Sequence, residues 1–198
     1  DSALWICTDA IDRLHTTANS HKRTMIIEIM GHHAGWLALY SGLAGGGDLI
    51  LIPEIEYDDN VIAKYLHKRV KNKKPYSIVV VAEGIKTKKD TSAAAHIAGQ
   101  IKEMTGMETR QTILGYIQRG GSPSPMDRIL ATRFGAKAVE LIVREEYGRM
   151  VAKKGPDIVS VPLSEVEGKL RLVPPDYPLI KKARSMDVCF GRKNSQIA

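Results

Sequence analysis

Three short runs of almost purely apolar, largely β-branched residues constrain the fold of this chain most. They are RTMIIEIM at residues 23–30, DLILIP at 48–53 and SIVVVA at 77–82. Strands that helices cover on both faces have such continuous apolar sequences, whereas strands with one wet face alternate. The runs are separated by segments with helical periodicity. The sequence therefore predicts an α/β fold with a parallel sheet flanked by helices.

Periodicity, capping residues and chain breakers locate the other elements. Ser124 is a good helix N-cap, because Pro125 follows at the first helical position and Asp127 lies in the first turn. The segment around Pro174, Pro175 and Pro178 predicts loop and a short helix. We expect helices over residues 2–20, 36–43, 58–73, 91–105 and 124–147, and further strands over 109–118 and 157–163.

Composition is ordinary for a globular protein, with 198 residues, 43% of them hydrophobic. No apolar run approaches the roughly 20 residues that a membrane-spanning helix needs, so no membrane partner is expected. The two cysteines, Cys7 and Cys189, lie far apart, which predicts no disulfide framework. The opening residues lack a basic, then apolar, secretory signal, so we expect a cytoplasmic protein. The first residue is Asp1 rather than Met, as in a piece of a longer chain.

The formal net charge of +7 allows nucleic acid, a membrane surface or an anionic small molecule as partner. Much of the excess lies in residues 67–74 and 86–89, and such runs are usually solvated helix faces and loops. Aromatic residues make up only 6% of the chain and do not alternate with the basic runs. This pattern argues against a stacking platform for single-stranded nucleic acid.

In parallel sheets, ligands bind beyond the carboxyl ends of the strands, so the polar residues there are the candidates for a site. Arg119 follows the predicted strand 109–118 and precedes Gly120 and Gly121. A guanidinium fits phosphate oxygens two at a time, and glycines let the backbone approach a ligand closely. The alternative is a loop arginine that pairs with an acid elsewhere.

Two further side chains lie at the same predicted edge. Tyr116 would share a strand face with Gln118, so its hydroxyl could donate to the same anion, or its ring could simply pack near the strand end. Glu83 ends the apolar run at 77–82 and could accept hydrogen bonds from sugar hydroxyls. A salt bridge from Glu83 to a nearby lysine is an equally good interpretation.

Four other polar residues give weaker signals. His32 and His33 suggest a metal site, but adjacent side chains of an extended segment point to opposite sides, so we expect no metal ligands in this chain. Arg23 and Arg110 lie at the beginnings of strands, the wrong end for a site in their own subunit. They are either solvated or reach the site of a neighbouring subunit.

Several segments together resemble the 6-phosphofructokinase family, in its bacterial and archaeal branch whose members use either ATP or pyrophosphate. The order and spacing match over most of residues 20–141. The segments that carry the resemblance are SHKRTMIIEIMGHHAGWLAL (20–39), GLAGGGDLILIPE (42–54), VVVAEG (79–84) and ETRQTILGYIQRGGSPSPMDRILATRFGAKAVEL (108–141).

The resemblance implies a two-domain enzyme that transfers a phosphoryl group from ATP or pyrophosphate to the 1-hydroxyl of fructose 6-phosphate, with Mg²⁺. Residues 1–120 would be the α/β domain that binds fructose 6-phosphate. Residues 121–198 would be a C-terminal helix and segments that pack back on the domain upstream. The family's donor-phosphate loop and catalytic Asp segment lie upstream of residue 2, so this chain alone is expected to be inactive.

The resemblance also assigns roles to individual residues. Glu83 matches the acid on the sugar hydroxyls, Arg119 the arginine on the 6-phosphate, and Tyr116 takes the place of a histidine. Met30, Gly31 and His32 match a Met-Gly-Arg motif, with His32 as a possible transition-state contact of lower charge than arginine. Arg23 and Arg110 match two arginines that reach the 6-phosphate from the adjacent subunit, which implies a homodimer or homotetramer.

The match is poor at the regulatory site of the familiar bacterial enzyme. Lys74 and Asp48 keep a lysine and an acid, but Pro75 replaces a second lysine and His15 an arginine. The resemblance therefore does not extend to control by nucleotides or phosphoenolpyruvate.

Two other functions remain open at this point. The chain could be a non-catalytic subunit that binds sugar phosphates and regulates a partner. It could also be a basic nucleic-acid binder, whose affinity would fall steeply with salt, whereas a sugar-phosphate protein would bind fructose 6-phosphate saturably.

Overall fold

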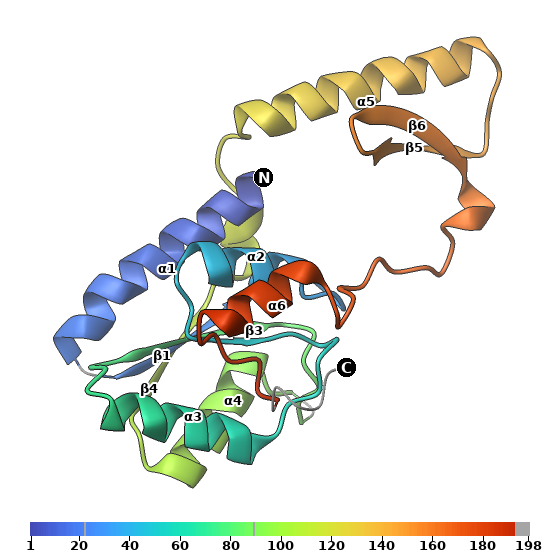
Figure 1. Ribbon diagram of the computed structural model, residues 1–198. Helices are drawn as coiled ribbons and strands as arrows, with labels where there is room; N and C mark the ends of the chain where they lie inside the picture. The colour runs from blue at the N-terminus through green and yellow to red at the C-terminus, as the bar shows by residue number, and fades with distance from the viewer. Residues whose placement is uncertain (22, 89, 193–198) are drawn as a thin grey trace. The chain divides into compact units, whose positions relative to one another are not determined.

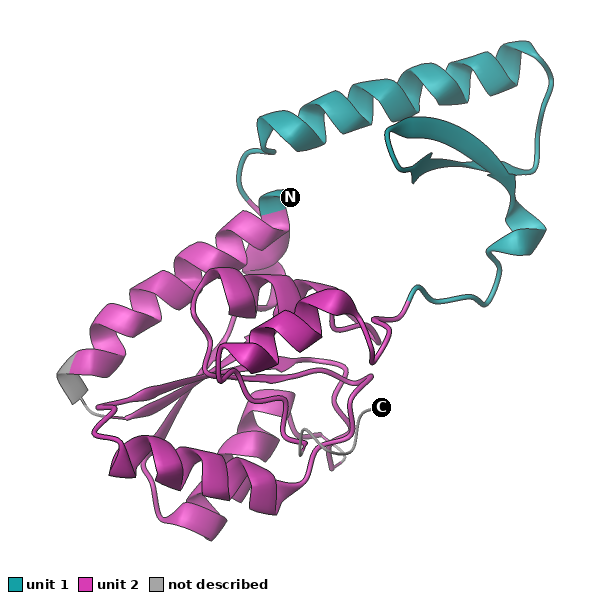
Figure 2. Cartoon of the chain, in the orientation of Figure 1, with its two compact units in different colours: residues 1–2, 121–171 teal, residues 3–120, 172–198 magenta. Residues whose placement is uncertain are grey.

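The computed structural model describes residues 1–21, 23–88 and 90–192, which divide into two compact units (Figure 2). The α/β unit comprises residues 3–120 together with the C-terminal segment that begins at residue 172. The hairpin unit comprises residues 1–2 and 121–171.

A four-stranded parallel sheet in the order β2-β3-β1-β4 is the centre of the α/β unit. All residues of β1, β2 and β3 are buried, which confirms the prediction from their apolar sequences. Ile29 lies opposite Ala82, and Glu28 lies opposite Ile113, so the carboxyl ends of β1, β3 and β4 are nearly level. The strands are β1 (Thr24–Ile29), β2 (Leu49–Leu51), β3 (Ser77–Ala82) and β4 (Thr109–Ile113).

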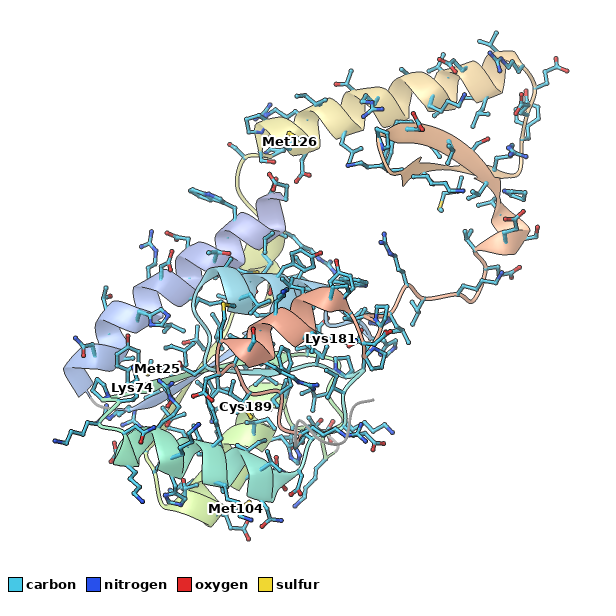
Figure 3. The ribbon with its side chains drawn as sticks, in the orientation of Figure 1. Met25, Lys74, Met104, Met126, Lys181 and Cys189 are labelled. Carbon is cyan, nitrogen blue, oxygen red and sulfur yellow. The ribbon has the colours of Figure 1, made fainter. Side chains whose placement is uncertain are left out.

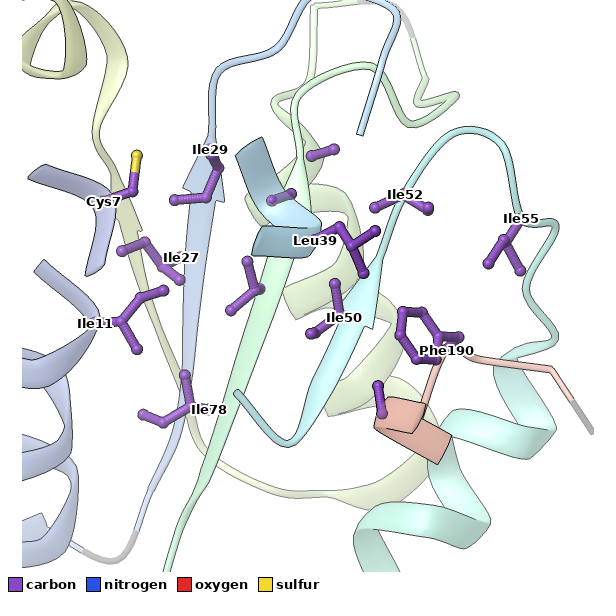
Figure 4. Packing of buried hydrophobic residues seen from close by; sticks show 14 of the residues in the cluster. Cys7, Ile11, Ile27, Ile29, Leu39, Ile50, Ile52, Ile55, Ile78 and Phe190 are labelled. Carbon is purple, nitrogen blue, oxygen red and sulfur yellow. The ribbon is translucent and has the colours of Figure 1, made fainter. Parts of the chain in front are cut away.

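Helices cover both faces of this sheet, as the sequence predicted (Figure 1). Alternate strand residues face opposite clusters, since Ile27 and Ile29 belong to one cluster and Ile26 to the other. Figure 4 shows the first cluster, which contains the free thiol of Cys7; burial raises the pKa of this thiol to about 11. The first face carries α1 (Ser2–His21), α2 (Trp36–Ala44) and α6 (Pro178–Ser185), and the second α3 (Asp59–Lys71) and α4 (Ala93–Thr105).

The C-terminal segment that begins at residue 172 packs on the α/β unit, whereas the sequence analysis grouped it with residues 121–171 as a helix and segments that pack back on the domain upstream. Phe190 and Ile180 are buried in the first cluster. The backbone of Cys189 lies beside β2, where its carbonyl accepts from the Ile50 N–H at 2.9 Å. The short helix α6 has too few apolar positions to reveal this packing from periodicity alone.

The hairpin unit consists of α5 (Pro125–Val143) and two antiparallel strands, β5 (Arg149–Lys154) and β6 (Asp157–Pro162). Ser124 caps α5 as predicted, because its hydroxyl accepts from the Asp127 N–H at 3.2 Å. The strand expected at 157–163 does not extend the parallel sheet but forms half of this hairpin. The sequence hid β5, RMVAKK, because three of its six residues are charged and do not alternate with apolar ones, and four of the six are exposed in the structure.

The strand predicted over residues 109–118 ends early, at Ile113. A 3₁₀-helix, η1 (Gly115–Arg119), follows it. Gly115 adopts a φ of +50°, a left-handed conformation that a strand cannot continue through. The residues that the sequence analysis placed on a strand face therefore lie on a tight turn.

Across the described ranges, no helix has the length and apolar character that crossing a bilayer requires.

Replacement of Phe190 by Ala tests the position of the returning segment. Because Phe190 is only 1% exposed, we expect the free energy of unfolding to fall by about 3–5 kcal/mol, measured by urea denaturation. Met186→Ala is the matched control in the same segment, since Met186 is 67% exposed and its loss should change stability by less than about 0.5 kcal/mol. Equal effects of the two substitutions would show that the segment is not packed in the core.

Candidate functional site

A pocket of about 270 Å³ lies at the carboxyl edge of the sheet. It brings together five of the residues that the sequence analysis selected: Met30, Gly31, His32, Glu83 and Arg119. Ala3, Leu37 and Gln118 complete its lining. The first three residues form the loop after β1, Glu83 follows β3, and Arg119 ends η1, which follows β4.

Glu83 anchors the loop after β1. One of its carboxylate oxygens, Oε1, accepts from the backbone N–H of Gly31 at 3.0 Å and from that of His32. These N–H groups lie beyond the end of β1 and have no strand partner, so the carboxylate satisfies them. Within the described part of the chain, Oε2 accepts no hydrogen bond and is left for a ligand donor. Neither lysine pairing nor any other salt bridge of Glu83 is present among these residues.

The same loop approaches the backbone after β3 so closely that residue 84 must be glycine. A Cβ atom on Gly84 would lie 2.4 Å from the carbonyl oxygen of His32. At the other end of the same loop, the two carboxylate oxygens of Glu54 accept from the Gly35 N–H at 2.9 and 3.1 Å. Oε1 of Glu54 also accepts from the Val173 N–H at 2.9 Å. Loop 30–35 is thus fixed at both ends by acids that follow neighbouring strands.

Arg119 brings an unneutralised positive charge to the pocket. Its side chain is exposed, and no ion pair or hydrogen bond to its guanidinium occurs within ranges 1–21, 23–88 and 90–192. The guanidinium carbon lies 5.6 Å from the centre of the Tyr116 ring, within the range of a cation–π contact. The alternative of an arginine paired with an acid is therefore not observed in this part of the chain.

Tyr116 does not line the pocket, and its side chain is 80% exposed. The expectation that it shares a face with Gln118 is wrong, because Gln118 is only 3% exposed on the turn of η1. A 3₁₀-helix repeats every three residues, so positions two apart point in different directions. The structure thus shows Tyr116 against Arg119, and donation from its hydroxyl to a phosphate remains a prediction.

Gln118 is the polar lining residue of this site that the sequence analysis did not select. Its side-chain carbonyl accepts from the Met30 N–H at 2.6 Å, and its amide nitrogen donates to the Met30 carbonyl at 3.3 Å. The sequence carries no signal for this role, because a glutamine beside an arginine in a predicted strand looks like a solvated residue.

His32 and His33 stack on each other, with ring centres 3.8 Å apart. The prediction that they point to opposite sides is wrong, since the segment is a turn in which His32 has a φ of +54°. A left-handed conformation at a non-glycine residue costs on the order of 1 kcal/mol or more and often marks a functional position. No group of three or more His, Cys, Asp or Glu side chains is placed to hold a metal ion in the described ranges.

Arg23 and Arg110 lie at the opposite edge of the sheet, at the amino ends of β1 and β4. Both approach one carboxylate oxygen of Glu108, at 2.8 Å from Arg23 Nε and 3.9 Å from Arg110 Nη2. Arg23 and Lys74 line a second pocket of about 340 Å³ there. The structure does not bring these cations to the first pocket, and their reach into a neighbouring subunit remains a prediction.

Two residues of the poorly matched regulatory region, Asp48 and His15, bind other groups of the same unit. Asp48 and Arg69 form an ion pair of 2.8 Å, and Asp48 also accepts from the Ile78 N–H at 2.9 Å. Burial is the main cause that raises the pKa of Asp48, partly offset by these two partners. His15 bonds to the Tyr76 hydroxyl at 3.0 Å and to the Gly45 carbonyl at 2.6 Å.

Comparison with known proteins shows that the chain is similar to phosphofructokinases. The family model described as Phosphofructokinase matches residues 1–142. ATP-dependent 6-phosphofructokinase 3 of Bacteroides thetaiotaomicron is 61% identical over 191 residues, which are 96% of this chain and 57% of that protein. Pyrophosphate–fructose 6-phosphate 1-phosphotransferase of Streptomyces coelicolor is 46% identical over 193 residues, or 88% of this chain and 56% of that protein.

Among solved structures, phosphofructokinase from Saccharomyces cerevisiae matches with a TM-score of 0.73 and 32% identity, over 83% of this chain and 23% of that one. The chain thus spans 56–57% of the length of the two curated relatives named above. Those proteins carry segments beyond the part to which this chain corresponds.

Replacement of Gly84 by Ala tests the close contact that holds the loop. The new Cβ would meet the His32 carbonyl, so we expect a loss of about 1–3 kcal/mol in the free energy of unfolding, measured by urea denaturation. Gly99→Ala is the control, because no atom lies within 4 Å of its Cβ position in α4 and alanine favours helices by about 0.5–1 kcal/mol. A Gly84→Ala protein as stable as the Gly99→Ala protein would contradict the described packing.

Proposed function

Because the chain belongs to the phosphofructokinase family, we propose that it is the sugar-phosphate-binding part of a 6-phosphofructokinase. The whole enzyme transfers a phosphoryl group to the 1-hydroxyl of fructose 6-phosphate and yields fructose 1,6-bisphosphate, a step of glycolysis. The pocket of Arg119 and Glu83 is the fructose 6-phosphate site in this proposal.

One observation carries the proposal. The unpaired guanidinium of Arg119 and the carboxylate of Glu83, of which only one oxygen accepts hydrogen bonds among the described residues, line the same pocket of about 270 Å³. Arg119 offers planar N–H donors for the dianionic 6-phosphate. Oε2 of Glu83 offers an acceptor for a sugar hydroxyl, while Oε1 keeps the loop in place. Met30 and Gly31 line the pocket beside these two groups, where they would contact the sugar.

The phosphoryl donor is ATP or pyrophosphate, since relatives of both kinds match the chain. His32 is the proposed transition-state contact, because a ring N–H can donate a hydrogen bond to charge that develops on the transferring group. The described residues offer no metal-ligand group, so Mg²⁺ would be held by donor phosphates and by segments upstream. When bound, Mg²⁺ neutralises phosphate charge.

Arg23 and Arg110 are proposed to complete the site of an adjacent subunit. Glu108 holds their side chains at one place on the amino edge of the sheet, where both guanidinium groups keep unused donors. A site of this kind is incomplete in a monomer, so the active protein is a homodimer or homotetramer.

The hairpin unit is proposed to pack against the upstream part of the protein. Met126 (labelled in Figure 3) is 62% exposed, and other large apolar side chains of α5 are equally open. Contiguous exposed apolar surface in a water-soluble protein usually marks an interface. The relatives carry about 43% of their length outside the matched region, which is enough for a covering domain. The exposed side chains are Met126, Ile129, Val139, Ile142 and Val143.

We place the protein in the cytoplasm, since both Cys7 and Cys189 are free thiols, as in a reducing compartment. A non-catalytic, sugar-phosphate-binding subunit is the alternative that the same pocket would serve. Nucleic acid is not proposed as a partner, because Arg119, the exposed cation at the site, belongs to a pocket rather than to a basic stripe.

Substitution of Arg119 by Met tests the phosphate contact. We expect the dissociation constant for fructose 6-phosphate, measured by isothermal titration calorimetry, to rise at least about tenfold, because hydrogen bonds to a charged group contribute about 1.5–3 kcal/mol. Arg13→Met is the matched control, since Arg13 pairs with Asp9 on α1 outside the pocket. Unchanged affinity in the Arg119→Met protein would exclude this pocket as the phosphate site.

Substitution of His32 by Arg tests the proposed transition-state contact, in a protein that also carries the upstream segments. Arginine carries a permanent charge and a planar fork of donors that fits phosphate oxygens, so we expect turnover to increase about two- to tenfold. His67→Arg on α3 adds the same charge outside the pocket and should leave turnover unchanged. A turnover that stays constant or falls in His32→Arg would count against the role of His32.

A further inference from the structure

Gln118 occupies an unusual place for a glutamine, because its side chain is buried and both ends of its amide bind the same residue. Its side-chain carbonyl accepts from the Met30 N–H at 2.6 Å, and its NH₂ group donates to the Met30 carbonyl at 3.3 Å. Met30 follows the last residue of β1 and has no strand partner at that point. The amide thus replaces the strand neighbour that the backbone of Met30 would otherwise need.

This contact ties η1 to the loop after β1. At the beginning of η1, the Leu114 N–H donates to the Glu28 carbonyl at 3.3 Å, which continues the pairing of β4 with β1. Near its end, Gln118 provides the tie to Met30. Arg119 is the next residue along the chain, so the same turn that carries Gln118 also carries the cation of the pocket.

The loop is held from its other side by Glu83. The Oε1 atom of Glu83 accepts from the N–H groups of Gly31 and His32, directly after the residue that Gln118 binds. Three consecutive residues are therefore held between a side chain from η1 and a side chain from the end of β3. This arrangement sets how far Arg119 lies from Glu83 across the pocket.

We propose that Gln118 is a positioning residue of the sugar-phosphate site. It sets the distance between the arginine that binds the phosphate and the loop and acid that bind the sugar. This inference rests on the proposed function of the pocket, and it assigns to Gln118 no contact with the substrate itself.

The side-chain amide of Gln118 both donates a hydrogen bond and accepts one, and a substitution can test whether both are needed. A protonated carboxyl group at position 118 can accept from the Met30 N–H and donate to the Met30 carbonyl, as the amide does. An ionised carboxylate can only accept, and its second oxygen would then repel the Met30 carbonyl. Because burial favours the neutral form of a carboxyl group, Gln118→Glu should recover function as the pH falls.

The experiment measures fructose 6-phosphate binding to the 198-residue chain by isothermal titration calorimetry at pH 5.5 and pH 8, with each variant compared with the unsubstituted protein at the same pH. We expect Gln118→Leu to raise the dissociation constant about tenfold or more at both pH values. Gln118→Glu should be impaired similarly at pH 8 and should recover most of the affinity at pH 5.5.

Gln100→Leu is the matched control. Gln100 is also a partly buried glutamine with two side-chain partners, Tyr57 and Asp59, but it lies on α4 and does not line the pocket. Its loss should leave the affinity for fructose 6-phosphate unchanged at both pH values. A loss of affinity in this control would mean that any buried glutamine matters, and it would overturn the specific role of Gln118.

The outcomes separate this inference from the proposed function. If the unsubstituted chain does not bind fructose 6-phosphate, the proposed function fails. If it binds and Gln118→Leu binds equally well, the positioning role fails. If Gln118→Leu does not fold, Gln118→Glu decides. At each pH, its dissociation constant is divided by that of the unsubstituted protein, and an equal ratio at pH 5.5 and pH 8 would overturn the inference.

Discussion

Loop 30–35 follows β1 out of the buried parallel sheet, and its backbone N–H and carbonyl groups have no strand partner there. The site depends on how these polar groups are satisfied. Buried N–H and carbonyl groups are costly unless they are hydrogen-bonded. Gln118, Glu83 and Glu54 supply the partners from three neighbouring elements. The sheet order β2-β3-β1-β4 makes this possible, because β1 lies between β3 and β4, β2 lies next to β3, and the carboxyl ends of parallel strands lie at the same edge.

Different side-chain atoms hold the loop and face the pocket, so the pocket has a fixed shape and still has polar groups free to bind a ligand. The residues that hold the loop use their polar atoms on backbone, so they define its shape. Arg119 and Oε2 of Glu83 have no such partner among the described residues and remain available to a ligand. Under the proposed function, such a preorganised site would bind a charged substrate without first breaking internal ion pairs.

The sequence predicted the elements that depend on local patterns. The apolar runs that became β1, β2 and β3 and the capping residue Ser124 were visible because burial and capping select particular residues at particular positions. The pocket residues Glu83 and Arg119 followed from the rule that ligands bind at the carboxyl ends of strands, and the family resemblance added Met30, Gly31 and His32. What the sequence could not reveal depends on contacts between distant residues: Gln118 with Met30, Phe190 in the core, and β5 with β6. Tyr116 was misplaced because the left-handed Gly115 turns the predicted strand into a 3₁₀-helix.

The central claim is that fructose 6-phosphate binds between Arg119 and the loop after β1. The most direct test is to map the backbone amide shifts of the isotopically labelled chain by NMR during titration with fructose 6-phosphate. The account predicts saturable shifts at Gly31, His32, Gly84 and Arg119, with little change at Leu66 of α3 and Gly99 of α4, which line neither pocket. Saturable shifts confined to α3 and α4 or to the amino edge of the sheet, or no saturable shifts at all, would contradict it.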